Sequence, residues 1–116
     1  MAEEKKTEAV ETAKKIEGAY VHQFRVPFTW DEKEYDSLTF DFDNLTGGDL
    51  LKVVDEMTML GTEMQFVREN DTNYQLGVAV RACKEKLPRD AYLSMKFGDL
   101  SKIVSRVRRF LLTQGL

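Results

Sequence analysis

The segment LTGGDLLKVVDEMTML, residues 45–60, carries the clearest helix-start signal in the sequence. Thr46 is a favourable N-cap residue, and the carboxylate of Asp49, three positions later, faces the positive end of the helix that would begin there. The apolar residues that follow recur at helical spacing and share one face: Leu50, Val53, Val54, Met57 and Leu60. We therefore predict a helix over residues 47–60, with Gly61 as a candidate stop.

The run before this helix alternates with the period of a β-strand, on both sides of a short polar turn. Its apolar members are Phe24, Val26, Phe28 and Trp30, then Leu38, Phe40 and Phe42. Two such runs predict a β-hairpin over residues 21–42, and Pro27, which cannot donate to a ladder, indicates an edge strand there. An isolated hairpin is only marginally stable, so its aromatic face must be covered. The helix over 47–60 is the expected cover.

Two further amphipathic segments follow. Asp71 is a candidate cap for a helix over residues 72–87, which Pro88 would end, and Gly98 precedes a last helix over residues 99–113. The apolar stripe of the first contains Leu76, Ala79, Val80, Cys83 and Leu87. The stripe of the second contains Leu100, Ile103, Val104, Val107, Phe110 and Leu111.

These elements predict an α+β domain over residues 20–116, in which an N-terminal β-hairpin packs on a mostly helical domain of three to four helices. Residues 1–19 are rich in charged residues and contain few large apolar ones. Little apolar surface is available there to offset the entropy lost on ordering. We expect this segment to be a charged arm, either flexible or a frayed helix.

The chain has 116 residues and a net charge of −3, which suits a single domain. Apolar residues make up 42% of it, enough to form a core, but no apolar run approaches the roughly 18 residues of a membrane-spanning helix. The first residues, MAEEKKTEAVE, lack the apolar core of a signal peptide. A single cysteine cannot form an internal disulfide and fits a reducing compartment. We therefore expect a protein of the cytoplasm with no membrane partner.

The residue types of most enzyme and metal sites are scarce. One histidine and one cysteine are too few for a histidine–cysteine metal site. We interpret His22 as a strand residue and Cys83 as a small buried hydrophobe, because a nucleophile would need exposure and a neighbouring base. The carboxylates of Asp41 and Asp43 could point to one side of a strand, but a solvated acidic face explains them better. We predict no catalytic residue, no cofactor and no metal site, and hence no enzyme.

Charge is unevenly distributed along the chain. Residues 31–56 carry nine acidic and two basic side chains, a net charge of −7, whereas residues 81–116 carry nine basic and three acidic ones, a net charge of +6. Such an asymmetry could drive weak head-to-tail self-association or steer a charged partner. We favour the simpler interpretation that the two regions complement each other within one domain.

The last predicted helix has a basic face, formed by Lys102, Arg106, Arg108 and Arg109. A helix that binds nucleic-acid phosphates would carry such residues, and so would the solvated face of any amphipathic helix. No aromatic side chain interleaves with these cations, and the chain is acidic overall. A small nucleic-acid-binding or regulatory protein that uses this helix is therefore the alternative function, not the favoured one.

Three large apolar residues do not fit the predicted apolar stripes: Met59, Phe66 and Leu112. Met59 falls among charged residues of its helix, and Leu112 lies on the flank of the last helix. Phe66 falls off the stripe if the first helix continues past Gly61. Single exposed apolar residues are common, whereas a cluster of them marks a partner surface, and methionine suits the binding of varied sequences. We predict that these three side chains contact a protein partner.

The order and spacing of four segments resemble those of the tail assembly chaperones of long-tailed bacteriophages and prophages. The segments are FRVPFTWDEKEYDSLTFDF (24–42), LTGGDLLKVVDEM (45–57), YQLGVAVRACKEKLP (74–88) and DLSKIVSRVRRFLL (99–112). The resemblance covers residues 24–112. Hairpins of that family often carry glycine in the turn, where this chain has Glu32.

The resemblance implies a non-enzymatic role. Proteins of this family bind the long tape-measure protein before it is packed in the tail tube, keep it soluble and help to recruit tube subunits. They leave before the virion is complete. Many such families also make a longer product by a ribosomal frameshift, and this chain corresponds to the short product. The expected partners are the tape-measure protein and, through the longer product, the tail tube protein, in the cytoplasm of the bacterial host.

Overall fold

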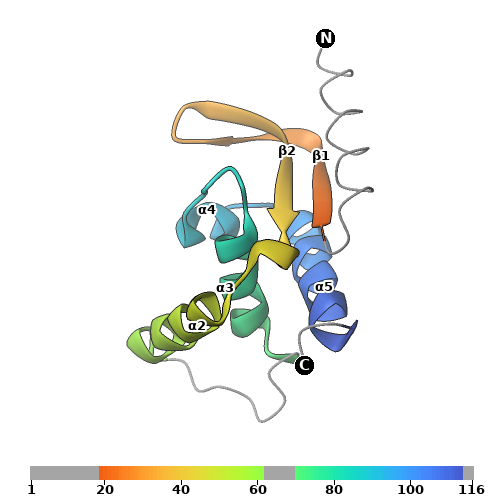
Figure 1. The fold of residues 1–116 in the computed structure, drawn as a ribbon. Coiled ribbons are helices and arrows are strands. Elements are labelled where there is room, and N and C mark those ends of the chain that lie inside the picture. Colours follow the sequence, from red (N-terminus) through yellow and green to blue (C-terminus); the bar gives the residue numbers. More distant parts are fainter. Residues whose placement is uncertain (1–18, 62–69, 114–116) are drawn as a thin grey trace.

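The computed structural model describes residues 19–61 and 70–113. In these residues a β-hairpin of β1 (Ala19–Trp30) and β2 (Lys33–Asp41) precedes a short 3₁₀ helix, η1 (Phe42–Asn44), and four α-helices (Figure 1). The helices are α2 (Gly47–Met59), α3 (Thr72–Ala82), α4 (Arg89–Leu93) and α5 (Phe97–Thr113). The predicted α+β fold, a hairpin packed on three to four helices, is confirmed. The arm predicted over residues 1–19 lies outside the described residues, except for Ala19 at the start of β1.

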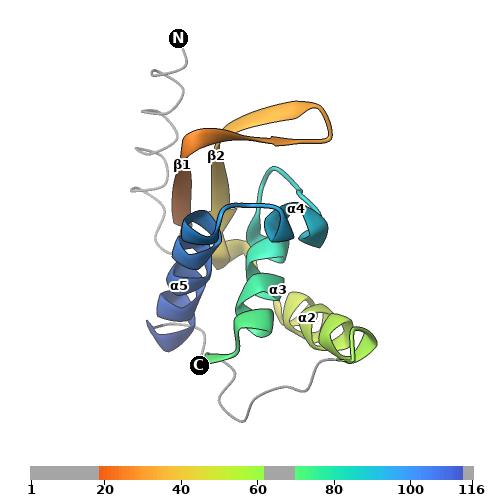
Figure 2. The ribbon, with the colours of Figure 1, turned by 180° about the vertical axis from the view of Figure 1, so that it is seen from behind.

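Helix α3 is the centre of the domain. It packs against α2, α4, α5 and β2, and Figures 1 and 2 show α2 and α5 on opposite sides of it. Its buried residues point in every direction around the helix: Tyr74, Gln75, Leu76, Gly77, Val78, Ala79 and Ala82. A helix that is buried all round, and not only along one stripe, belongs to the interior of a domain. The narrow stripe predicted for this segment therefore understated its burial.

The hairpin is covered by α5 and α3. Helix α5 packs on β1 and α3 packs on β2, whereas α2 packs chiefly on α3. The prediction that the helix over 47–60 covers the hairpin was therefore wrong. After β2 the chain passes through η1, and α2 then runs away from the sheet (Figure 1). The stronger apolar stripe of α5 takes its place, with Ile103 and Val107 fully buried.

The pairing of β1 with β2 is interrupted in the middle of β1. Antiparallel pairing stops after Gln23 and resumes at Phe28, and the residues between them include Pro27, which has no N–H to donate. Phe24 is buried there and stacks on Phe28, with ring centroids 5.5 Å apart. Val26, predicted to face the helices beside these two, is instead 57% exposed. The apolar and polar residues continue to alternate in the sequence here. The hydrogen-bonded pairing that would direct the apolar ones to one face is interrupted.

The hairpin turn consists of Asp31 and Glu32, whose φ angles are 51° and 65°. Two-residue turns with positive φ at both positions match the twist of the flanking strands and favour glycine at the second position. Glu32 occupies that position here, and a left-handed conformation costs about 1–2 kcal/mol for a residue with a side chain. The packing of the hairpin therefore stabilises a turn conformation that Glu32 disfavours.

Helix α3 is shorter than the helix predicted over 72–87. It ends at Ala82, and Cys83 turns into an extended conformation and forms a bridge with Phe40 of β2. The N–H of Lys84 then donates to the carbonyl oxygen of Thr39 at 2.8 Å. The exposed edge of β2 thus offers these backbone groups partners outside the helix. Cys83 is buried, as predicted, but through this bridge and not through a helical stripe.

The start and stop signals of α2 are both used. The hydroxyl of Thr46 accepts from the N–H of Asp49, whose carboxylate accepts in return from the N–H of Thr46, which makes a capping box. At the other end Gly61 has a φ of +70°, which ends the helix one residue before the predicted limit, at Met59. The alternative of a helix that continues through Gly61 is therefore excluded. The last helix, predicted over 99–113, begins two residues earlier, at Phe97.

The crossing of α2 over α3 depends on Gly77. A Cβ atom added at Gly77 would lie 2.7 Å from Cγ1 of Val53, closer than two carbon atoms approach each other. Val53 is 2% exposed and its χ1 angle is stiff because it is β-branched, so it has little freedom to move away. The two helices therefore fit together only while position 77 has no side chain.

We expect Gly77→Ala to destabilise the protein. Overpacking of a core costs about 1–3 kcal/mol, against a gain of at most about 1 kcal/mol in helix propensity. Urea denaturation should show a lower midpoint for this variant than for Gly47→Ala, where an added Cβ meets nothing within 4 Å. The double variant Gly77→Ala/Val53→Ala should lose less stability than the sum of the losses of the two single variants, because Val53→Ala removes the side chain that the new Cβ meets. Equal midpoints for the two alanine variants would show that the helices are not this close.

Candidate partner-binding surface

Exposed apolar side chains gather on α2. Within residues 19–61 and 70–113, eight large apolar side chains are exposed, and four of them lie on α2 or directly after it: Leu50, Leu51, Met59 and Leu60. Helix α2 buries only Val53 and Met57. Leu50 and Leu51 lie near the start of α2, and Met59 and Leu60 lie at its end, so the helix offers a partner two pairs of exposed apolar side chains.

The three residues predicted to contact a partner do not lie together in the structure. Met59 is 86% exposed at the end of α2, and Leu112 is 45% exposed near the end of α5. Phe66 lies outside the described residues. Met59 and Leu112 come from separate helices on opposite sides of α3, so the structure does not unite them in one patch (Figure 1).

Most of the exposed apolar side chains of α2 were not predicted from the sequence. Leu50 and Leu60 were expected in the buried stripe, whereas they are 42% and 55% exposed. A helical wheel shows which side chains share a face, but it does not show how far the neighbouring helix extends. One signal was available: Leu51 follows Leu50 directly and falls outside the stripe, which makes the apolar surface wider than one contact needs.

An apolar groove runs between α2, α3 and the C-terminal half of α5. Its volume is about 290 Å³. It is lined by Leu50 and Val53 of α2, Tyr74 and Val78 of α3, and Phe110 and Leu111 of α5. Leu45, which follows η1, also lines it. The groove therefore lies directly beside the exposed Leu50 and extends the apolar surface of α2 toward α5.

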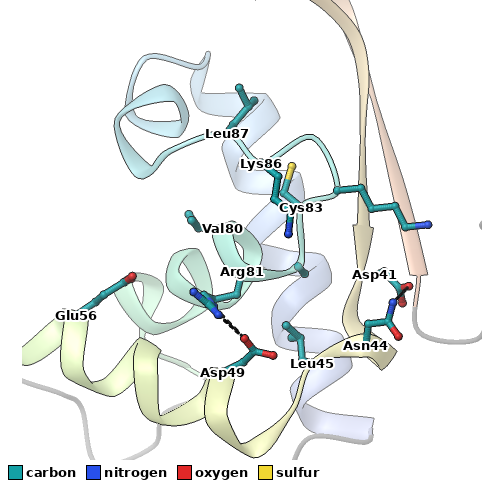
Figure 3. Close-up of a pocket in the computed structure, with 12 residues that line it drawn as sticks. Asp41, Asn44, Leu45, Asp49, Glu56, Val80, Arg81, Cys83, Lys86 and Leu87 are labelled. Carbon is teal, nitrogen blue, oxygen red and sulfur yellow. Dashed lines mark hydrogen bonds and ion pairs between the residues drawn. The ribbon is translucent and has the colours of Figure 1, made fainter.

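A second, polar hollow lies between α2, the end of α3 with the segment that follows it, and the end of β2 (Figure 3). Its volume is about 470 Å³, and acidic and basic side chains line it in equal number: Asp41, Asp49 and Glu56 against Arg81, Lys84 and Lys86. The Asp41 carboxylate accepts a hydrogen bond from the Asn44 side chain at 2.9 Å. Because opposite charges are mixed within it, this hollow does not select a ligand of either sign.

The ion pair of Asp49 with Arg81 separates the groove from the polar hollow, because both residues line both spaces. Arg81 donates to Oδ1 of Asp49 from Nη2 at 2.6 Å and from Nε at 3.1 Å. The hydrogen bond from the N–H of Thr46, and then that from Arg81, lower the pKa of Asp49 from 3.8 to about 2. Nothing in the local sequence signals this pair, since its members are far apart in the chain.

His22 is buried in a hydrogen-bonded chain that joins β1 to α5. It is 1% exposed; Tyr20 Oη lies 2.9 Å from Nδ1, and Asp99 Oδ1 lies 2.9 Å from Nε2. Its ring also meets the edge of Phe24. The groove and the polar hollow do not include it, so these bonds position the hairpin on α5. Within the described residues, no three His, Cys, Asp or Glu side chains gather as a metal site would require.

Two of the four cations on α5 are engaged by the protein itself. The guanidinium of Arg106 lies 5.8 Å from the centroid of the Tyr20 ring, and Nε of Arg108 donates to the side chain of Asn70 at 2.9 Å. Lys102 and Arg109 are exposed. The basic face predicted as the alternative binding surface is therefore only partly available to an external phosphate.

The Cys83 thiol has the surroundings of a packed core residue. It is 1% exposed, and Sγ lies 3.7 Å from Oε1 of Glu85. Burial raises the pKa of Cys83, which disfavours the reactive thiolate. This environment suits a small hydrophobe better than a nucleophile.

Comparison of the chain with protein-family models, with curated protein sequences and with solved structures gives no significant match. No helix of the described part of the chain is long and apolar enough to cross a membrane.

We expect acid to weaken the two interactions of Asp49, its capping hydrogen bond in α2 and its ion pair with Arg81 of α3. Because its pKa is lower in the folded protein, its ionised form stabilises the fold above about pH 4, and this contribution disappears as the pH falls from about 4 to 2. Asp49→Asn removes the contribution, which is about 1 kcal/mol or less for a partly exposed pair.

Urea midpoints measured between pH 7 and pH 2.5 test this expectation. Asp49→Asn should be less stable than the natural protein at pH 7, and the difference should shrink below about pH 4. The exposed Asp55 on the same helix supplies a matched control, since Asp55→Asn should change the urea midpoint at pH 7 little. A constant difference between the natural protein and Asp49→Asn at every pH would contradict the assignment.

Proposed function

We propose that the protein is a non-enzymatic assembly chaperone of the phage-tail type. It binds the tape-measure protein, keeps it soluble and helps to recruit tail tube subunits. The observation that carries the proposal is the set of exposed apolar side chains at the two ends of α2: Leu50, Leu51, Met59 and Leu60. The resemblance of residues 24–112 to tail assembly chaperones gives this surface its expected partner.

The surface suits a client that exposes long apolar helices. Each apolar side chain that leaves water on binding contributes roughly 25 cal/mol per Å² of buried area, without demanding a particular sequence. Met59 adds an unbranched, flexible side chain that adapts to different neighbours. A chaperone must release its client, and a surface spread over one helix can bind without enclosing it.

The surroundings of the titratable groups also support a binding protein over an enzyme. Asp49 is paired with Arg81, and the Cys83 thiol is buried with a raised pKa. His22 is committed to Tyr20 and Asp99 inside the fold. None of these groups has the exposure and the activating neighbour that nucleophilic or acid–base catalysis requires.

The alternative is a nucleic-acid-binding or regulatory protein that uses α5. It has less support, because Arg106 and Arg108 already contact Tyr20 and Asn70. Salt distinguishes the two functions: binding to phosphates weakens steeply as salt increases, whereas apolar capture does not.

In the proposed role the protein acts in the cytoplasm of the bacterial host and is absent from the mature virion. The tape-measure protein is its direct client, and a longer frameshifted product would recruit the tail tube protein. Any self-association driven by the charge asymmetry is weak.

We expect Leu51→Ser combined with Met59→Ser to impair capture of the tape-measure protein while the fold persists. The two side chains are 65% and 86% exposed, so each change should alter the free energy of unfolding by about 0.5 kcal/mol or less. Apolar anchors dominate interfaces, so co-expression should leave much less of the tape-measure protein soluble.

Leu93→Ser combined with Phe97→Ser is the matched control, because these residues are 62% and 90% exposed but lie on α4 and α5. The control pair should keep the tape-measure protein soluble, and thermal melts should show both double variants folded. Full solubility of the client with the α2 variant would place the capture surface elsewhere.

A further inference from the structure

Of the three long helices, α2 has the fewest neighbours within the described residues. It packs chiefly on α3, and Val53 and Met57 are the only side chains that it buries. Figures 1 and 2 show it at the margin of the domain, with its C-terminal end pointing away from the hairpin. The position of α2 therefore depends mainly on its contact with one other helix.

Helix α5, by comparison, is held by several elements. It packs on both α3 and β1, and Phe110 stacks on Phe42 of η1 with ring centroids 5.0 Å apart. Oδ1 of Asp99, near the start of α5, lies 2.9 Å from Nε2 of the buried His22 on β1. None of these contacts includes α2. The contacts that join the hairpin, α3 and α5 would therefore persist if α2 moved.

Two open spaces border α2 beside its contact with α3. The apolar groove, of about 290 Å³, touches α2 at Leu50, and the polar hollow, of about 470 Å³, touches it at Glu56. Protein interiors normally leave few voids larger than a water molecule. On these two flanks α2 faces open space rather than packed side chains, so it can move without displacing another element.

One ion pair fixes α2 to α3. Oδ1 of Asp49 accepts a hydrogen bond from Arg81 at 2.6 Å, while Oδ2 of the same carboxylate accepts from the N–H of Thr46 at 2.8 Å. The two side chains of the pair are 21% and 29% exposed, so water and salt compete with it. Such a pair favours the docked helix without holding it permanently.

The two ends of α2 allow it to leave α3. Leu45 and Thr46 before it are extended, and Gly61 after it has a φ of +70°. A helix of 13 residues is only marginally stable in water on its own, so α2 should lose most of its helical hydrogen bonds once it leaves α3. Detachment therefore exposes its backbone amides together with Val53 and Met57.

We propose that α2 is a detachable cover of α3, which opens as one unit while the hairpin, α3 and α5 remain folded. Opening exposes Val53, Met57 and the Gly77 side of α3, and the ion pair of Asp49 with Arg81 is its latch. Binding elements are drawn from the less stable parts of a fold, and the open form offers a partner more apolar surface than the closed one. Opening is a property of the free chain, so it holds whether or not the proposed function is correct.

Native-state hydrogen exchange of the full chain tests the opening without any substitution. At low urea concentrations, the amides of residues 53–58 should exchange at least about tenfold faster than the slowest amides of α3, and they should share one dependence on urea. A shared dependence indicates that α2 opens as a unit, because the surface exposed sets the urea slope. Exchange of α2 and α3 at the same rate, or α2 amides that respond to urea independently of one another, would overturn the proposal.

A disulfide between α2 and α3 would lock the cover. A Cβ atom at position 77 would lie 3.7 Å from Cβ of Val53, close to the mean Cβ separation of about 3.8 Å across a disulfide. Val53→Cys also removes Cγ1, the atom nearest to that Cβ. In a chain that carries Val53→Cys, Gly77→Cys and Cys83→Ala, oxidised glutathione should join positions 53 and 77, and dithiothreitol should separate them again.

We expect the oxidised chain to lose the difference in exchange between α2 and α3, and the reduced chain to regain it. The slowest amides of α3 in the same sample are the internal reference, so a change in overall stability alters both helices alike. If α2 still exchanged at least about tenfold faster than α3 in the oxidised chain, its exchange would come from local fraying, and the proposal would be overturned.

Arg81→Met examines the latch. It removes the ion pair but leaves the capping box of Thr46 with Asp49, so exchange of α2 relative to α3 should become about threefold faster. Arg89→Met is the matched control, because Arg89 donates to Asn73 at 3.0 Å, outside α2, and its removal should leave the ratio unchanged. Equal ratios in the two variants would show that the ion pair is not the latch.

Discussion

Burial of α3 on every side is the constraint on which the rest of the structure depends. Its buried residues point in all directions, so each side must be covered by another element. Helix α5, β2, α4 and α2 each cover one side. Gly77 allows α2 to approach closely, but Val53 and Met57 are the only residues that α2 buries. The remaining apolar side chains of α2 are left exposed, so the packing of the core and the candidate surface have the same cause.

Local signals predicted the elements, because their causes are local. The N-cap at Thr46, the cap at Asp71 and the stop at Gly61 all depend on residues within one helical turn. Which elements pack against each other could not be predicted in this way. The cover of the hairpin and the early end of α3 at Ala82 are decided by contacts between distant segments, such as the bridge of Phe40 with Cys83. The apolar stripe of a helix shows which side chains are buried together, but it does not show which element buries them.

The candidate surface was predictable only in part, for the same physical reason. Met59 stands among charged residues, so its exposure follows from its own helix. Leu50 belongs to a regular apolar stripe, and its exposure depends on where α3 and α5 stop. The groove combines residues from three helices that are separated in the sequence, and the ion pair of Asp49 with Arg81 closes one part of it. No pattern within one segment indicates such a combination.

In the proposed function, α3 is the stable core and α2 is the element that binds the client. Hydrogen exchange of the free protein and of its complex with the tape-measure protein tests both parts in one measurement. In the free protein, the amides of α3 should exchange most slowly. In the complex, protection should increase over α2 and the C-terminal half of α5, with little change in the turn between β1 and β2. Protection that appears in the hairpin while α2 remains unchanged would show that α2 does not bind the client.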